Sequence, residues 1–93
     1  MVHHLVFFNL NDGVSAADAV SRLHGLKGLI PELITLEAGE SISGDSGQWD
    51  VGLYTTFSDR DALEAYRVHP EHQKVVEWLK ANTSARTFVD FET

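Results

Sequence analysis

Cysteine is absent from the 93 residues of this chain, and basic residues are few. Without cysteine, the chain has no disulfide framework, no thiol nucleophile and no zinc–thiolate site. The seven lysine and arginine residues are scattered among fourteen acids, and the formal charge is −7. Binding to nucleic acids or to anionic membranes requires a concentrated positive surface. We therefore predict no nucleic-acid partner and no membrane partner.

Long hydrophobic runs are also missing. The first five residues contain no cationic leader, and the apolar run that follows is too short for a signal peptide. No segment approaches the length of a membrane span. We expect a cytoplasmic protein with a single domain over residues 1–93. A chain of this size buries only about 60–65% of its unfolded surface, so association with a partner is a reasonable expectation.

Hydrophobic periodicity divides the chain into strands and helices. Runs of β-branched and aromatic residues predict strands over 2–10, 33–38, 49–57 and 86–91. The stretch 39–48 contains three glycines and three serines. This composition predicts a mobile hairpin connection between the second and third strands.

A first helix is expected after the first strand. Ser15 offers an N-cap, and Asp18 three residues later gives a variant of the capping box. Apolar residues then recur at helical spacing, and Gly28 and Pro31 are expected to end the helix. His24 on this helix is expected to be exposed.

A second helical region is broken near its middle. Residues 59–65 and 73–81 both have helical patterns, with a core stripe of Ala62, Leu63, Tyr66, Val75, Val76 and Leu79. Pro70 disfavours a helical conformation at His69 and lacks an N–H, but it suits the first position of a new helix. We therefore predict a corner at His69, around which Tyr66, His69 and His72 gather.

The order β-α-β-β-α-β predicts an α+β fold, the ferredoxin-like arrangement of a four-stranded antiparallel sheet. Both helical regions then cover one face of the sheet, although the first strand carries large apolar residues on both faces. Each large apolar side chain left in water forfeits about 1.5–3 kcal/mol. We predict that the second face, with Leu5, Phe7 and Phe88, packs on another copy to form a homodimeric, eight-stranded α/β barrel.

Several segments together resemble a known family. They are the stretches 3–8, 29–33, 49–51, 57–66, 69–72 and 89–91. The most specific is Tyr66-x-x-His69-Pro70-x-His72, combined with the His4-Leu5 pair in the first strand. Over nearly the whole chain, these segments resemble the stress-responsive A/B barrel (Dabb) domain family. The resemblance implies a dimeric α+β barrel.

The resemblance implies less about activity than about fold. Most members of the family have no established activity, but one plant branch contains olivetolic acid cyclase, a cofactor-independent enzyme that closes a ring on a linear polyketide. Its functional residues correspond to Tyr66 and His72, with His4 in a supporting position. A further histidine of that enzyme corresponds to Val51 here. One polar wall of the pocket is therefore missing.

Tyr66, His72 and His4 are the candidate catalytic residues. His72 suits a general base that removes a proton α to a carbonyl, while Tyr66 donates a hydrogen bond to the developing enolate. The alternative is structural: His72 satisfies the backbone at the corner, Tyr66 is a core aromatic residue, and His4 is a buried histidine with one partner. A shared cavity of about 300 Å³ or more would favour a site.

Three functions remain open at this point, and the sequence does not decide whether the protein is an enzyme. The first is a homodimer that binds a small apolar or aromatic ligand between helices and sheet. The second is a cyclase-like acid–base enzyme. The third is an enzyme like the antibiotic-biosynthesis monooxygenases, which are also dimeric ferredoxin-like barrels, although the histidine corner fits these less well.

We predict neither a cofactor nor a metal site. His69 and His72 lie near Glu71 and Glu77, but no third ligand follows at a useful spacing. His3, which alternates with His4, is expected at the dimer face or its rim.

Overall fold

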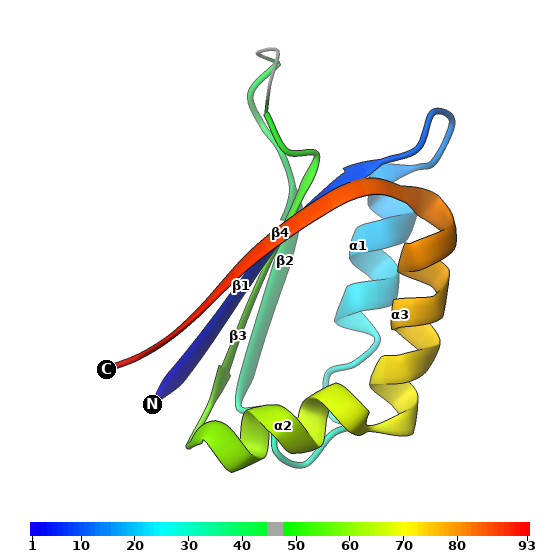
Figure 1. The fold of residues 1–93 in the computed structure, drawn as a ribbon. Coiled ribbons are helices and arrows are strands. Elements are labelled where there is room, and N and C mark those ends of the chain that lie inside the picture. Colours follow the sequence, from blue (N-terminus) through cyan, green and yellow to red (C-terminus); the bar gives the residue numbers. More distant parts are fainter. Residues whose placement is uncertain (45–47) are drawn as a thin grey trace.

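The computed structural model describes residues 1–44 and 48–93, which form an antiparallel sheet and three helices (Figure 1). The elements are β1 (Val2–Leu10), α1 (Ala16–His24), β2 (Thr35–Glu40), β3 (Val51–Phe57), α2 (Arg60–Val68), α3 (Pro70–Asn82) and β4 (Thr83–Glu92). The strand order is β2-β3-β1-β4, with every pair antiparallel. The predicted ferredoxin-like α+β fold is confirmed. None of the described helices is long and apolar enough to cross a membrane.

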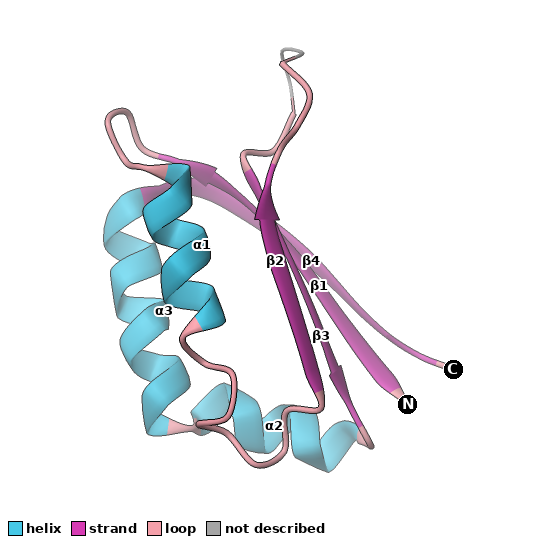
Figure 2. Ribbon diagram, turned by 180° about the vertical axis from the view of Figure 1, so that it is seen from behind, coloured by secondary structure: helices cyan, strands magenta, loops and turns pink. Residues whose placement is uncertain are grey.

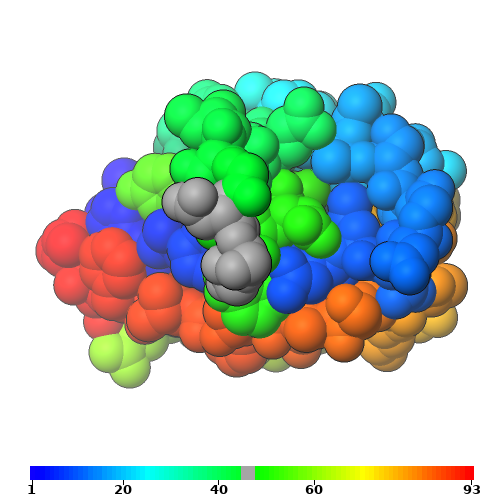
Figure 3. Space-filling view, turned by 90° about the horizontal axis from the view of Figure 1, so that it is seen from above, coloured from blue at the N-terminus to red at the C-terminus, as the bar shows by residue number. Residues whose placement is uncertain are grey.

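The helices all lie on one side of the sheet, as the opposite views of Figures 1 and 2 show. Helices α1 and α3 run side by side, and α2 crosses beneath them at one end. The core fills the space between the two layers and includes Phe8, Leu23, Phe57 and Tyr66. Strand β4 follows one edge of the molecule, coloured orange to red in Figure 3. No described residue forms a layer on the other face of the sheet.

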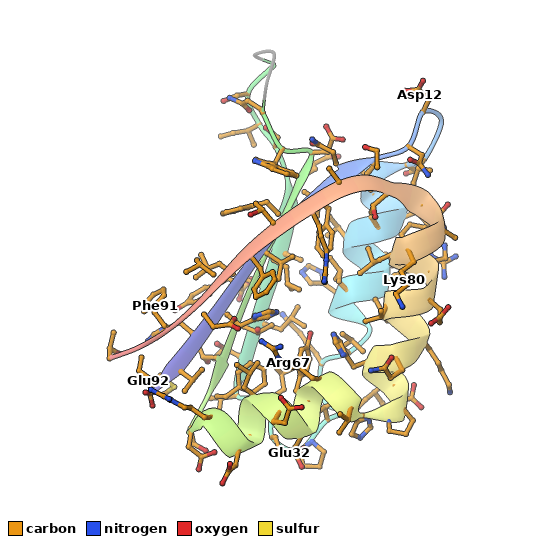
Figure 4. All side chains as sticks on the ribbon, in the orientation of Figure 1. Asp12, Glu32, Arg67, Lys80, Phe91 and Glu92 are labelled. Atoms are coloured by element: carbon orange, nitrogen blue, oxygen red, sulfur yellow. The ribbon has the colours of Figure 1, made fainter. Side chains whose placement is uncertain are left out.

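Strand register fixes which side chains face the helices. Because paired residues share a face, Phe88, which pairs with Val6, lies on the helical side. Val89, which pairs with Leu5, lies on the outer side, and Phe91 lies outward from the sheet in Figure 4. The prediction that Phe88 belongs to the outer face was therefore wrong. We call the uncovered side the outer face and define it by His3, Leu5, Phe7, Tyr54, Val89 and Phe91.

Several predicted boundaries shift. Helix α1 ends at His24 because the next N–H groups, of Leu26 and Lys27, bond to carbonyls only three residues back, and the chain then turns at Gly28, which has a φ of +80°. The Leu33 N–H bonds to the carbonyl of Ile30, a turn contact that delays β2 to Thr35. These two changes leave the core pattern intact, because Leu26 and Ile30, which follow α1, remain buried.

The stretch 39–48 is only partly covered by the structure. Gly39 and Glu40 belong to β2, which extends beyond its predicted end. Residues 45–47 lie outside the described residues, so the prediction of a mobile connection there stays a prediction.

Candidate functional site

The corner between α2 and α3 is built as the sequence predicts. His69 has an extended backbone (φ −65°, ψ 134°), and Pro70 occupies the first turn of α3. The Nδ1 atom of His69 accepts a hydrogen bond from the Glu71 N–H at 3.1 Å. His69 is thus the N-cap of α3, a structural role. The part of the chain that the structure describes holds no cluster of three or more side chains suited to a metal ion.

His72 follows in the first turn of α3, and one of its ring nitrogens is already engaged. Its Nδ1 lies 3.1 Å from the carbonyl oxygen of Arg67. A carbonyl only accepts, so Nδ1 carries the proton, and in the neutral ring Nε2 has a free lone pair. Burial is the main cause that lowers the pKa of His72 below its ordinary 6.5; the hydrogen bond to the Arg67 carbonyl opposes this shift, and repulsion from His4, Arg67 and His69 adds to it. The neutral form, with Nε2 available as a base, is therefore favoured.

Tyr66 is fully buried on α2 beside His72. The two ring centroids are 4.1 Å apart, and the centroid of the Phe57 ring lies 5.0 Å from that of Tyr66. The Tyr66 hydroxyl has no hydrogen-bond partner among the described residues. Burial also raises the pKa of this phenol far above its ordinary value, so the hydroxyl keeps its proton and can donate it in a hydrogen bond. A buried, unsatisfied hydroxyl is costly, and in native proteins it calls for an explanation.

His4 belongs to a polar chain that links β1, β4 and α2. Its Nδ1 contacts Oδ1 of Asp90, and Oδ2 of Asp90 accepts from Nη2 of Arg67 at 2.5 Å. The carboxylate fixes the His4 ring with Nδ1 as the donor. The His4 ring lies 6.3 Å from that of Tyr66. Arg67 lies between α2 and the sheet in Figure 4.

These side chains converge on one cavity of about 220 Å³ between the helices and the sheet. His4, Tyr66 and His72 all line it. Most of the remaining wall is apolar and includes Val6, Phe8, Leu53, Val75, Leu79 and Phe88. The convergence that the sequence predicted is present, although the cavity is smaller than the typical lower limit of about 300 Å³ for ligand pockets.

The other two histidines lie away from this site. His3 lies on the outer face, where its ring nitrogens contact the Tyr54 hydroxyl at 2.7 Å and the Thr93 hydroxyl at 2.9 Å. Its ring also stacks on Phe91 at 4.7 Å. His24 is half-buried rather than exposed, because its Nε2 points into protein without a partner among the residues described.

Sequence reasoning missed Arg67 and Asp90. A charged residue inside the apolar run 88–91 was a signal for Asp90. Recognising its partner, however, requires the register that sets Asp90 opposite His4.

A family model described as the stress-responsive A/B barrel domain (Dabb) matches residues 2–93. The chain belongs to this family. The resemblance inferred from the sequence is confirmed.

Relatives come from several bacteria. An uncharacterized protein of Streptomyces coelicolor is 36% identical, over 78% of this chain and 80% of its own. A dimeric ferredoxin-like protein of unknown function from Jannaschia sp. is 30% identical, with a TM-score of 0.80, over 99% of this chain and 98% of that one. A dimeric protein of unknown function with a ferredoxin-like fold from Bacteroides fragilis is 26% identical, with a TM-score of 0.83, over 99% and 95%.

Two structures with functional names share the fold at lower identity. Hydroxynitrile lyase from Passiflora edulis is 12% identical, with a TM-score of 0.84, over 97% of this chain and 90% of that one. An antibiotic biosynthesis monooxygenase is 15% identical, with a TM-score of 0.77, over 100% and 98%. At such identities the likeness shows the fold alone.

Proposed function

We propose that this A/B barrel protein is a homodimer that binds a small apolar or aromatic ligand in the cavity between the helices and the sheet. The observation that carries the proposal is the buried hydroxyl of Tyr66, a residue that lines the cavity; this hydroxyl has no partner among the described residues. A ligand with a hydrogen-bond acceptor would satisfy this donor, and the apolar wall would take the rest of the molecule.

The cavity volume limits the size of the ligand. An apolar protein cavity of about 150 Å³ holds benzene, so a cavity of about 220 Å³ suits a single ring with a short substituent. Acetophenone meets both conditions, because it combines one ring with a carbonyl acceptor. Ethylbenzene has nearly the same shape but no acceptor.

A titration with these two probes tests the proposal. We expect acetophenone to bind wild-type protein about fivefold more tightly than ethylbenzene, since one hydrogen bond contributes about 1 kcal/mol. In Tyr66→Phe the difference should vanish while both compounds still bind. Failure of both probes to bind, or an unchanged preference for acetophenone in Tyr66→Phe, would contradict the proposal. Calorimetry or ligand-observed NMR measures both affinities.

The homodimer part of the proposal is supported by the outer face. Phe7, Tyr54, Val89 and Phe91 are all exposed on it, and proteins that share this fold, from Jannaschia sp. and Bacteroides fragilis, are described as dimeric. Packing two such faces together by two-fold symmetry would bury the aromatic side chains. Sedimentation equilibrium at micromolar concentration should give twice the chain mass, and a monomer there would contradict this part.

A second candidate function is acid–base catalysis without a cofactor, which the tautomer of His72 favours. With Nδ1 held by Arg67, Nε2 is the nitrogen left to remove a proton α to a bound carbonyl. As the C–H bond breaks, its electron pair moves to the carbonyl oxygen, and a hydrogen bond from Tyr66 stabilises the enolate. The chemistry is that of a cyclase-like enzyme, with His4 supporting the cavity wall.

Hydrogen–deuterium exchange at the methyl group of acetophenone separates the catalyst from the binder. In D2O, a catalyst should accelerate this exchange well above the rate in buffer, as followed by NMR. His72→Asn keeps a nitrogen near the position of Nδ1 but has no base at Nε2. The variant should therefore still bind acetophenone without accelerating exchange. If the wild-type protein binds acetophenone without accelerating exchange, ligand binding is supported and the catalytic function is contradicted.

A further inference from the structure

Positive charge gathers at the cavity, in contrast to the rest of the chain. The sequence has fourteen acidic residues and only seven basic ones. Three of those seven, Arg67, Lys80 and Arg86, line the cavity, and no aspartate or glutamate among the described residues does. They come from three different elements, α2, α3 and β4. The periodicity of a single helix or strand does not explain this cluster, because its members come from different elements. The composition does not explain it either, because acids outnumber bases along the chain.

The three cations are not equally neutralised. Arg67 is paired with Asp90, within the polar chain that also includes His4. Lys80 contacts Glu77 only at 3.8 Å, and both side chains are more than two-thirds exposed (71% and 74%). Such an exposed pair contributes little. Arg86 has no ion-pair partner within residues 1–44 and 48–93. Lys80 and Arg86 therefore leave a net positive charge at the cavity wall.

Arg86 also lies close to the apolar part of the wall. Its guanidinium carbon is 5.7 Å from the centre of the Phe88 ring, and that of Arg67 is 6.0 Å from the same ring. Phe88 thus lies near two arginines: Arg67, which is paired with Asp90, and Arg86, which has no ion-pair partner among the described residues. Figure 4 shows Lys80 on α3 towards its C-terminal end, well away from Arg67 beside α2. The cavity is thus lined both by Tyr66 and His72 and by the cations Lys80 and Arg86.

Simpler explanations exist for each cation taken singly. Lys80 is in the last turn of α3, where a positive charge interacts favourably with the helix dipole. Arg86 is on an edge strand, where charged side chains discourage strand pairing between molecules. Neither explanation requires the side chain to line an apolar cavity, and neither explains why every charged residue of the wall is basic.

We propose that the ligand of this cavity is a small carboxylic acid, bound as its carboxylate, with one ring or a short alkyl chain as its apolar body. This inference rests on the proposed function. Arg86 donates paired hydrogen bonds to the carboxylate, and Lys80 adds a second positive charge. The apolar body lies against Phe88 and the helices.

Two probes of equal shape, 4-acetylbenzoate and the uncharged 4-acetylbenzamide, both keep the carbonyl acceptor proposed for Tyr66 and test the inference by calorimetry on the full chain. We expect the carboxylate to bind about tenfold more tightly at low salt, with the preference shrinking as ionic strength rises. Arg86→Gln and Lys80→Gln should each reduce the preference at least threefold while leaving the affinity for the amide unchanged. Arg60→Gln and Lys27→Gln remove the same charge from residues that do not line the cavity and should leave the preference intact.

The possible outcomes separate this inference from the function on which it rests. If both probes bind equally, or if Lys27→Gln lowers the preference as much as Lys80→Gln, the carboxylate site is refuted while ligand binding stands. If neither probe binds and acetophenone also fails, the proposed function itself is refuted. Tight binding of the carboxylate that Arg86→Gln weakens and Arg60→Gln does not would support the inference.

Discussion

The rings of Tyr66 and His72 lie 4.1 Å apart although the residues belong to different helices. The break between α2 and α3 causes this approach. Residues six apart lie on different faces of a straight helix, but Pro70 starts a new helix and brings His72 back towards Tyr66. The corner thereby places a proton-bearing phenol and a neutral imidazole on the same cavity wall.

Tyr66→Phe should stabilise the ligand-free protein. The substitution removes a buried hydroxyl that has no partner among the described residues, and an unsatisfied buried group costs about 1–3 kcal/mol. We expect the free energy of unfolding to rise by about 1 kcal/mol, which is about 4–8 °C in Tm for a domain of this size. Thermal and urea denaturation measure the change. A clear loss of stability would mean that the hydroxyl is satisfied in the free protein.

His72→Asn should flatten the acid side of the stability profile. Burial lowers the pKa of His72 in the folded state below its ordinary 6.5, so protonation favours the unfolded chain. The contribution of His72 is therefore complete above about pH 6.5 and is lost as the pH falls through the lower folded pKa. The charges of His4, Arg67 and His69 also oppose its protonation, whereas the hydrogen bond to the backbone carbonyl of Arg67 favours it.

Urea unfolding at a series of pH values from 7.5 to about 5 measures this effect. Asparagine does not titrate and retains a donor for the Arg67 carbonyl, so the variant should lose less stability than the wild type over this range. His72→Gln, whose amide does not match the Nδ1 position, serves as the control for that donor. Parallel curves for His72→Asn and the wild type would show that His72 is not responsible.

Asp90 and Glu92 offer a matched pair on β4. Each carboxylate accepts from an arginine of α2, Arg67 for Asp90 and Arg60 for Glu92. Only Asp90 is half-buried and also holds His4. Asp90→Asn should cost about 1–2 kcal/mol, a value reduced for the partial exposure of Arg67. Glu92→Gln, at an exposed pair, should change the free energy of unfolding much less. If the two substitutions lower the free energy of unfolding equally in chemical denaturation, the contact between Asp90 and His4 contributes nothing to stability.

Local sequence signals were sufficient for the order of elements and for the corner. The proline at position 70, the capping residue Ser15 and the alternation in β1 act over a few residues, and each holds in the structure. Contacts over long distances in the sequence were harder. Asp90 is recognisable as a partner of His4 only once β1 and β4 are in register.

Phe88 illustrates the same limit. Alternation in β4 correctly separates Phe88 from Val89, but it does not say which of the two faces the helices. Pairing of Phe88 with Val6, which is buried beneath the helices, decides the question. The alternation shows which residues of the strand share a face, but only the pairing with the neighbouring strand shows which of the two faces meets the helices.

The corrected assignment of these two residues gives the sharpest test of the homodimer. Val89 and Phe88 are neighbours with nearly equal exposure, 51% and 49%, but they point to opposite faces of the sheet. If the outer faces of two copies pack together, Val89→Glu buries an unpaired charge, which costs about 3–5 kcal/mol. The dissociation constant of the dimer should then rise at least a hundredfold.

Phe88→Glu is the control, since it adds the same charge on the cavity side and should leave the dissociation constant within about threefold of the wild type. Sedimentation equilibrium gives the association constants, and far-UV circular dichroism checks that each variant is folded. If Val89→Glu unfolds on dissociation, Phe7→Glu, at the centre of the same face, provides a second measurement. A dimer that Phe88→Glu disrupts and Val89→Glu does not would place the interface on the helical side of the sheet, contrary to the proposal.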